Sequence, residues 1–294
     1  MGYPYHTVGF ISITHTMCLC SDAWRMEHKP SVDTEYYLKR RYSDPTDKER
    51  GVQPFFLRSI HNFYQKFSAS WNAGSAKLLE YGGGPAIYSL ISAAPFVSEV
   101  TFADYQQTNI DEVLAWKNCS KGHHDWTPYF KYVISQLEGN DSDEGVVQRQ
   151  DELRAKCKEF LCGNLLAKNV LSSDSEPSDG FYEKFDIVSS NFCCDVVATD
   201  VKEYQSYVQS VGELVKPGGF IISLVSLEES YWHTSYSDER LFHLYLTKDD
   251  AEKAYSEAGF DIIYTDVHYL PESARNILND CKANMFIGGQ KKKS

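Results

Sequence analysis

Hydrophobic positions along this chain follow two patterns that alternate. Short apolar runs, typical of buried strands, are separated by stretches whose apolar residues recur at helical spacing. The runs predict strands at residues 76–81, 99–103, 186–190, 220–225, 260–267 and 285–289. The intervening stretches predict helices at 85–94, 108–116, 201–215 and 247–259. Because such alternation joins parallel strands through right-handed crossovers, we predict an α/β fold with a mostly parallel, doubly wound sheet.

Two regions lie outside this alternation. Residues 33–67 precede the first strand and are predicted to be helical in two pieces, with a break at Asp44-Pro45. In the second piece, Phe56, Ile60 and Phe63 recur at helical spacing. The other region is predicted to hold a charged helix at 148–160 between acidic surface loops at 139–145 and 172–180.

Composition limits the classes of function. A chain of 294 residues with 42% hydrophobic and 24% charged residues suits one elaborated globular domain. The formal net charge of -12 argues against a nucleic-acid partner, because phosphate contacts need clustered Lys and Arg. Eight cysteines are spread along the chain in neither a disulfide framework nor the paired spacing of a zinc site. No apolar run reaches the about 18 residues of a membrane span.

These limits lead to an expected organisation. We expect a poorly packed extension at residues 1–30, one domain with an N-terminal cap at 31–290, and a basic tail at 291–294. Residues 7–20 are apolar but lack the basic start of a secretory signal, so a cytoplasmic protein is expected. We expect a monomer that binds a small molecule, and no metal, membrane or nucleic acid.

The clearest candidate site is the stretch LEYGGGPAIYS at residues 79–89. It combines a predicted strand, three glycines and a predicted helix, and glycines at such a turn let the backbone approach a ligand closely. Asp104 lies 20 residues after Gly84, at the end of the second strand. A carboxylate there can accept hydrogen bonds from both ribose hydroxyls of an adenosine, which suits NAD, FAD and S-adenosylmethionine alike. A plain turn without a ligand is the alternative.

Three residues discriminate among these ligands. The dinucleotide pattern G-x-G-x-x-G needs a third glycine, and Ile87 stands in its place. Pro85 removes an amide that a pyrophosphate would need, and Glu80 adds a negative charge before the turn. The predicted ligand therefore lacks a pyrophosphate and carries positive charge, as S-adenosylmethionine does.

Five sequence blocks together carry a resemblance to a known family. They are YLKRRY, LEYGGGPAIYSLISA, FADYQQTN, DIVSSNFCCDVV and LVKPGGFIISLVSLEESYW. From about residue 36 to about residue 290, the chain resembles the nicotinamide, phenylethanolamine and indolethylamine N-methyltransferases. The resemblance implies a Rossmann-like class I fold that uses S-adenosylmethionine, with a mostly parallel central sheet, helices on both faces and an N-terminal helical cap.

The resemblance also implies a cofactor site. Its expected residues are Tyr37, Tyr42, Gly82, Gly83, Gly84, Tyr88, Asp104, Tyr105, Asn109, Asn164 and Asn191. One departure concerns the adenine: the family usually has an Asp-Val pair after the third strand, where this chain has Cys162-Gly163-Asn164. Asn164 could supply its amide and carbonyl instead.

The implied chemistry is an SN2 transfer of a methyl group to an amine nitrogen. Glu229 and Asp195 match acids expected to bind the amine or relay its proton. The expected substrate contacts are Val225, His243 and Asp280. Val225 and His243 replace an Asp and a Ser of the nicotinamide enzymes, so an arylalkylamine is favoured.

Several alternatives stay open. A nicotinamide or other pyridine could be the substrate, and a catalytically inactive homologue could keep the cofactor fold. Glu229 and Asp195 could be solvated surface acids, and His243 a packed or surface histidine.

Overall fold

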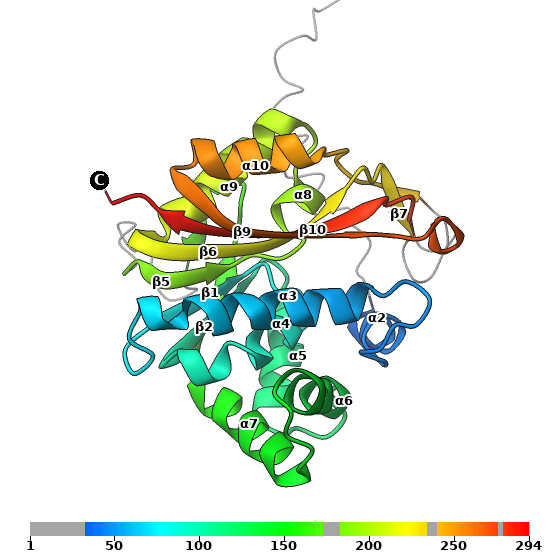
Figure 1. Cartoon of the computed structure of the whole chain (residues 1–294), viewed down its shortest axis with the longest axis vertical. Helices are drawn as coiled ribbons and strands as arrows, with labels where there is room; N and C mark the ends of the chain where they lie inside the picture. The colour runs from blue at the N-terminus through cyan, green and yellow to red at the C-terminus, as the bar shows by residue number, and fades with distance from the viewer. Residues whose placement is uncertain (1–32, 168, 173–182, 234–239, 276–278, 294) are drawn as a thin grey trace, which may run out of the picture. The chain divides into compact units, whose positions relative to one another are not determined.

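The hydrophobic runs form one eight-stranded sheet, with strand order β4-β3-β2-β1-β5-β6-β10-β9 (Figure 1). The computed structural model describes residues 33–167, 169–172, 183–233, 240–275 and 279–293, which belong to one compact unit. The strands are β1 (Lys77–Tyr81), β2 (Glu99–Asp104), β3 (Cys157–Gly163), β4 (Leu171–Ser172), β5 (Phe185–Ser189), β6 (Val215–Leu227), β9 (Phe260–Tyr269) and β10 (Ala283–Lys291).

Strand directions confirm the predicted, mostly parallel sheet. β3, β2, β1, β5 and β6 are parallel neighbours, whereas β10 runs antiparallel to both β6 and β9, and β4 antiparallel to β3. The chain leaves β1 toward β2 on one side and later returns to β5 on the other. This reversal of strand order opens a crevice at the carboxyl ends of β1 and β5, where ligands of such sheets bind.

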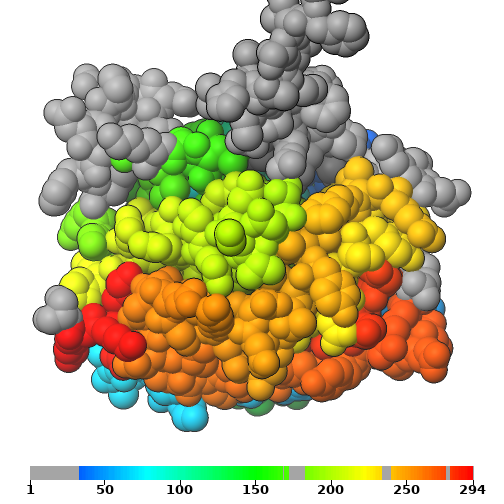
Figure 2. All heavy atoms as spheres, turned by 90° about the horizontal axis from the view of Figure 1, so that it is seen from above, coloured from blue at the N-terminus to red at the C-terminus, as the bar shows by residue number. Residues whose placement is uncertain are grey.

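Helices cover both faces of the sheet, as predicted. One face is covered by α3 (Val52–Phe67), α4 (Tyr88–Ile91), α5 (Gln107–Lys117), α6 (Thr127–Lys131) and α7 (Asp143–Lys156) (Figure 1). The other is covered by α8 (Cys194–Val197), α9 (Val201–Glu213) and α10 (Lys248–Glu257), seen from outside in Figure 2. The remaining helix, α2 (Thr34–Arg41), lies at the same end of the sheet as the short strand β7 (Tyr231–His233).

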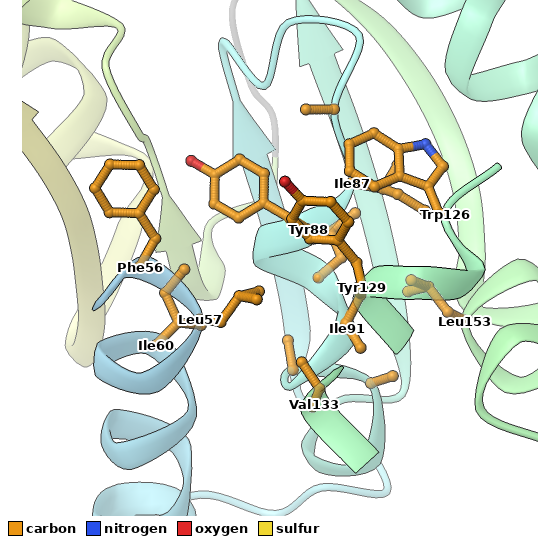
Figure 3. Close-up of a cluster of buried hydrophobic side chains, with 14 of the residues drawn as sticks. Phe56, Leu57, Ile60, Ile87, Tyr88, Ile91, Trp126, Tyr129, Val133 and Leu153 are labelled. Atoms are coloured by element: carbon orange, nitrogen blue, oxygen red, sulfur yellow. The ribbon is translucent and has the colours of Figure 1, made fainter. Parts of the chain in front are cut away.

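The packing of α3 follows from its apolar pattern. Phe63 is fully buried, with its ring centroid 6.1 Å from that of Phe220 on β6 and 5.9 Å from that of Phe286 on β10. Phe56 and Ile60 lie on the side of α3 that faces Tyr88 (Figure 3). Burying each such side chain contributes about 1.5–3 kcal/mol to the stability of the fold. These apolar residues therefore hold α3 against the sheet, beside the turn of Gly82, Gly83 and Gly84.

Some predicted elements were wrong in extent. The helix expected at 85–94 is reduced to α4 and a 3-10 turn at Ala94–Phe96, because Gly84 has a left-handed backbone and Pro95 interrupts the later part. The charged helix ends at Lys156, and the residues from Cys157 onward form β3 instead. Side chains along β3 are only partly buried, so its pattern resembles an exposed helix.

Other elements were missed or extended. The hairpin of β7 with β8 (Arg240–Phe242) and the helix α6 had no clear signal, and α7 begins inside the loop expected at 139–145. Lys291 belongs to β10 rather than to a tail: its Nζ donates to the carbonyls of Gly212 and Ala258. The extension at 1–30 and residues 173–180 of the second loop lie outside the described residues. Among the described helices, none is long and apolar enough to cross a membrane.

Candidate functional site

The glycine turn is tightly packed on one side and open on the other. Gly82 and Gly84 have left-handed φ angles of 69° and 60°. A Cβ at Gly82 would lie 2.2 Å from Cys193 Sγ, and one at Gly83 would lie 2.6 Å from the Phe102 ring. A Cβ at Gly84 would meet no heavy atom within 4 Å. The turn therefore fills the space behind it and leaves room at Gly84 for a ligand.

Asp104 meets this turn, as predicted. Its Oδ2 accepts a hydrogen bond from Gly84 N at 2.8 Å, and its Oδ1 accepts from Gln106 N and Asn109 Nδ2 at 2.9 Å each. Burial raises the pKa of the Asp104 carboxyl, and these donors oppose the rise. Asn109 thus orients Asp104, while the side chain of Tyr105 is exposed.

A second buried acid lies where β1 ends. Glu80 Oε1 accepts from Asn191 Nδ2 at 3.2 Å, and Asn191 Oδ1 accepts from Leu224 N at 3.0 Å. Glu80 Oε2 is buried without a hydrogen-bond partner in the described part of the chain. Burial raises the pKa of Glu80 to about 7, opposed by hydrogen bonds from Ser189, Ser89 and Asn191. A cation placed beside this carboxyl would favour its ionised form.

Aromatic residues join the N-terminal cap, which consists of α2, α3 and the loop between them, to the turn formed by Gly82, Gly83 and Gly84. Tyr42, just after α2, stacks on Tyr88, with ring centroids 5.5 Å apart, and contacts Tyr37 edge-on at 5.9 Å. Phe56 contacts both Tyr88 and Phe192, at 6.2 and 5.1 Å. Phe192 follows β5 with a left-handed φ of 51°, a strained backbone that is common at functional sites.

A cavity of about 610 Å³ adjoins this aromatic group. The cap lines one side, and the ends of β5, β6, β7 and β10 supply the other. Four predicted site residues line it: Tyr37, Tyr42, Glu229 and His243. The glycine turn, Asp104 and Asn109 are not among the lining residues and form a neighbouring cluster, connected through the contact of Tyr42 with Tyr88.

Glu229 is the buried acid of the cavity. It is only 2% exposed, and its Oε1 accepts from Asn279 Nδ2 at 2.8 Å. The other side of the same amide, Asn279 Oδ1, accepts from Arg50 Nη2 at 3.0 Å. The preceding Glu228 has a left-handed φ of 51° and turns outward to Lys282, whose Nζ lies 2.6 Å from its Oε2. Of these two neighbouring acids, only Glu229 lines the cavity.

Asp195 lies behind the cavity wall rather than on it. It belongs to α8, is 1% exposed, and its Oδ2 accepts from Ser226 N at 3.1 Å. The same oxygen lies 3.7 Å from His243 Nε2, and His243 Nδ1 lies 3.0 Å from the Leu244 carbonyl. Burial raises the pKa of Asp195, and His243 opposes the rise. Asp195 does not line the cavity itself, but its neighbours His243 and Ser226 do, so its expected role toward the amine stays a prediction.

Two predicted substrate contacts lie away from the cavity lining. Val225 is buried inside β6, where it pairs in register with Met285 of β10, and its side chain belongs to a core cluster. The carboxylate of Asp280 accepts from Ser230 N, Ser230 Oγ and Tyr231 N, so it holds the start of β7. Asn279, its neighbour, lines the cavity instead.

Asn164, the expected adenine contact, makes hydrogen bonds with neighbouring residues of its own turn. Asn164 N donates to the Val170 carbonyl, and Asn164 Oδ1 accepts from Leu166 N, which closes the turn between β3 and β4. Most of the cap residues that line the cavity were not predicted from the sequence, and Arg41 and Arg50 are among them. Arg41 lies in the block YLKRRY, but nothing in the sequence placed it in the same cavity as Glu229.

A family model compared with the chain identifies its family. The model described as the NNMT/PNMT/TEMT family matches residues 22–292. This chain belongs to that family. Membership confirms the resemblance carried by the five sequence blocks, together with the expected enzyme class, an N-methyltransferase that uses S-adenosylmethionine. The match begins at residue 22, inside the segment expected to be an extension.

Named relatives are similar over much of the chain. Phenylethanolamine N-methyltransferase from Sus scrofa is 27% identical over 262 residues, 87% of each protein. Nicotinamide N-methyltransferase from Homo sapiens is 30% identical over 190 residues, which are 65% of this chain and 68% of that protein. These identities fit the NNMT/PNMT/TEMT family without separating its substrates.

A solved structure agrees with the fold. The magnesium protoporphyrin IX methyltransferase ChlM from Synechocystis PCC 6803, solved with bound SAM, gives a TM-score of 0.50 at 11% identity. The alignment covers 92% of this chain and 97% of that one. With the strand order above, it confirms the predicted Rossmann-like class I fold.

Proposed function

We propose that this member of the family transfers a methyl group from S-adenosylmethionine to the nitrogen of a small arylalkylamine, such as a phenylethanolamine or an indolethylamine. The observation that carries the proposal is Glu229, a buried carboxylate facing a cavity with aromatic walls. A buried carboxylate needs a cationic or donor partner, and a protonated amine supplies both.

The cluster at the glycine turn fits the cofactor. When bound, S-adenosylmethionine supplies a methyl group on a positively charged sulfur. Asp104, which lies beside Gly84 at the end of β2, would accept from a ribose hydroxyl. Glu80, whose Oε2 is buried without a partner among described residues, would face the ammonium of the methionine part. Gly84 would leave space between them.

The cavity residues have distinct parts in the reaction. An alkylamine is protonated near neutral pH and must lose a proton before its nitrogen can attack a methyl group. Glu229 would hold the ammonium and accept that proton directly or through water, while Asn279 keeps the carboxylate in place. Phe56, Phe192 and Trp232 would hold the aryl group and exclude water, which aligns the nitrogen.

A pyridine such as nicotinamide is the second candidate, because nicotinamide N-methyltransferase from Homo sapiens is also among the relatives of this chain. A pyridine nitrogen is mostly unprotonated at neutral pH, so its methylation does not need a proton acceptor. Glu229 therefore separates the two candidates.

Transfer of a labelled methyl group to phenylethanolamine, tryptamine and nicotinamide tests the proposal. We expect transfer to the two alkylamines, and a loss of about 10- to 100-fold in kcat/KM for Glu229→Gln, from one charged hydrogen bond. Glu228→Gln is the matched control, because it removes the neighbouring, partly exposed acid that does not line the cavity. Transfer to nicotinamide alone, unaffected by Glu229→Gln, would favour the pyridine. Binding of S-adenosylhomocysteine without any transfer would indicate an inactive homologue.

A further inference from the structure

Two guanidinium groups on the cap side of the cavity each have a buried Nε without a hydrogen-bond partner among the described residues. Arg41, the last residue of α2, and Arg50, just before α3, both line the cavity. The Nε atoms of both are buried and make no hydrogen bond among the described residues. None of the ion pairs found within 4.0 Å in that part of the chain includes either residue. Burial, and then the charge of Arg41, lower the pKa of Arg50.

The acids of the cap do not neutralise these groups at contact distance. The carboxylate of Asp44 accepts from Thr46 N and Oγ1, and Asp47 Oδ2 accepts from Val52 N. Asp47 and Glu229 attract Arg50 from a longer distance, and Glu49 is exposed. Asp44 and Asp47 are therefore engaged by their own loop. A partly buried guanidinium in this state is satisfied best by an anion that arrives with a ligand.

The position of Arg50 indicates which ligand would bring that anion. Asn279 accepts from Arg50 through its Oδ1 and donates to Glu229 through its Nδ2. A cationic and an anionic group of the cavity are thus separated by one side-chain amide. This arrangement complements a ligand whose own carboxylate and ammonium lie a few atoms apart.

We propose that Arg41 and Arg50 form a carboxylate subsite, and that the amine substrate is an aromatic amino acid rather than a simple arylalkylamine. The inference rests on the proposed function, because Glu229 must hold the amine. The ammonium then meets Glu229, the carboxylate meets the guanidinium groups, and the ring lies against Phe56 and Phe192. The methionine carboxylate of the cofactor is the other possible source of an anion. The glycine turn does not line this cavity, which favours the substrate.

Calorimetry on protein saturated with S-adenosylhomocysteine tests the subsite. Tryptophan and tryptamine, and phenylalanine and phenylethylamine, differ only in the carboxylate. We expect each amino acid to bind about tenfold or more tightly than its matching amine, as expected for a charge-assisted contact. Arg50→Gln should remove that preference, and Arg41→Gln should reduce it. Lys39→Gln, an exposed charge loss on the same helix, should keep it. If Arg50→Gln does not fold, Arg50→Lys should retain part of the preference.

Two outcomes would overturn the subsite. One is equal affinity for amino acid and amine in the parent protein, and the other is an unchanged preference in Arg50→Gln. If that unchanged preference is accompanied by a loss of S-adenosylhomocysteine affinity, the anion belongs to the cofactor. Failure of the proposed function is distinct: arginine-dependent binding of amino acids, with no labelled methyl transferred, would support the subsite and contradict the reaction.

Discussion

Replacing Glu80 with glutamine should stabilise the ligand-free protein at alkaline pH. Glu80 is 1% exposed, and burial raises its pKa from 4.5 to about 7. That difference corresponds to about 3 kcal/mol. Because the folded pKa is above the unfolded one, the contribution is fully present below pH 4.5 and is lost as the pH rises through about 7. Glutamine keeps an oxygen to accept from Asn191 and cannot ionise.

Urea unfolding between pH 5 and pH 8 measures this effect. The free energy of unfolding of Glu80→Gln, relative to the parent, should increase by about 2–3 kcal/mol over that range. Glu213→Gln, the same change at an exposed acid, should give no such trend. A difference between Glu80→Gln and the parent that stays constant with pH would contradict this expectation, because the Glu80 carboxyl would then titrate alike in the folded and unfolded states. The same substitution should weaken S-adenosylhomocysteine binding about tenfold at pH 8, since it removes the charge opposite the ammonium.

Three further substitutions test separate parts of the site. Asp104→Asn should raise the Kd for S-adenosylhomocysteine by about tenfold or more in calorimetry, since one charged hydrogen bond contributes about 1.5–3 kcal/mol; an unchanged Kd would remove Asp104 from the ribose site. Gly82→Ala should lower the free energy of urea unfolding by about 1–3 kcal/mol more than Gly122→Ala, because both have a positive φ but only the Cβ at Gly82 meets Cys193. Equal losses would mean that the clash is relieved at no cost. His243→Gln should lower methyl transfer to amines more than it weakens binding of S-adenosylhomocysteine, because His243 lines the cavity and not the glycine turn; equal effects in the two assays would indicate a packing role.

The parts of the site that the sequence predicted are local ones. Asp104 meets Gly84 because adjacent parallel strands end at the same edge of the sheet, so strand ends read from the apolar runs bring these residues together. Asn191 reaches Glu80 for the same reason, from the end of β5. In each case the spacing along the chain and the direction of the strands are enough to bring the two residues to the same edge of the sheet.

The parts that the sequence did not predict depend on backbone turns and distant contacts. The resemblance singled out Glu229, but the cause was not visible in the sequence: the left-handed φ of Glu228 turns that residue outward and leaves Glu229 in the cavity. Val225 is buried where β6 pairs with β10, and the five sequence blocks give no information about this pairing. Arg50 and Asn279 are 229 residues apart, and only the folded chain brings them together.

The most direct test of the account is mass spectrometry of purified protein incubated with S-adenosylmethionine and a small amine. We expect an arylalkylamine or an aromatic amino acid to gain one methyl group on nitrogen while S-adenosylhomocysteine forms in equal amount. Glu229→Gln should reduce both products together, whereas Glu228→Gln should not. Failure to bind S-adenosylmethionine, or formation of a methylated amine at the same rate by Glu229→Gln, would contradict these expectations.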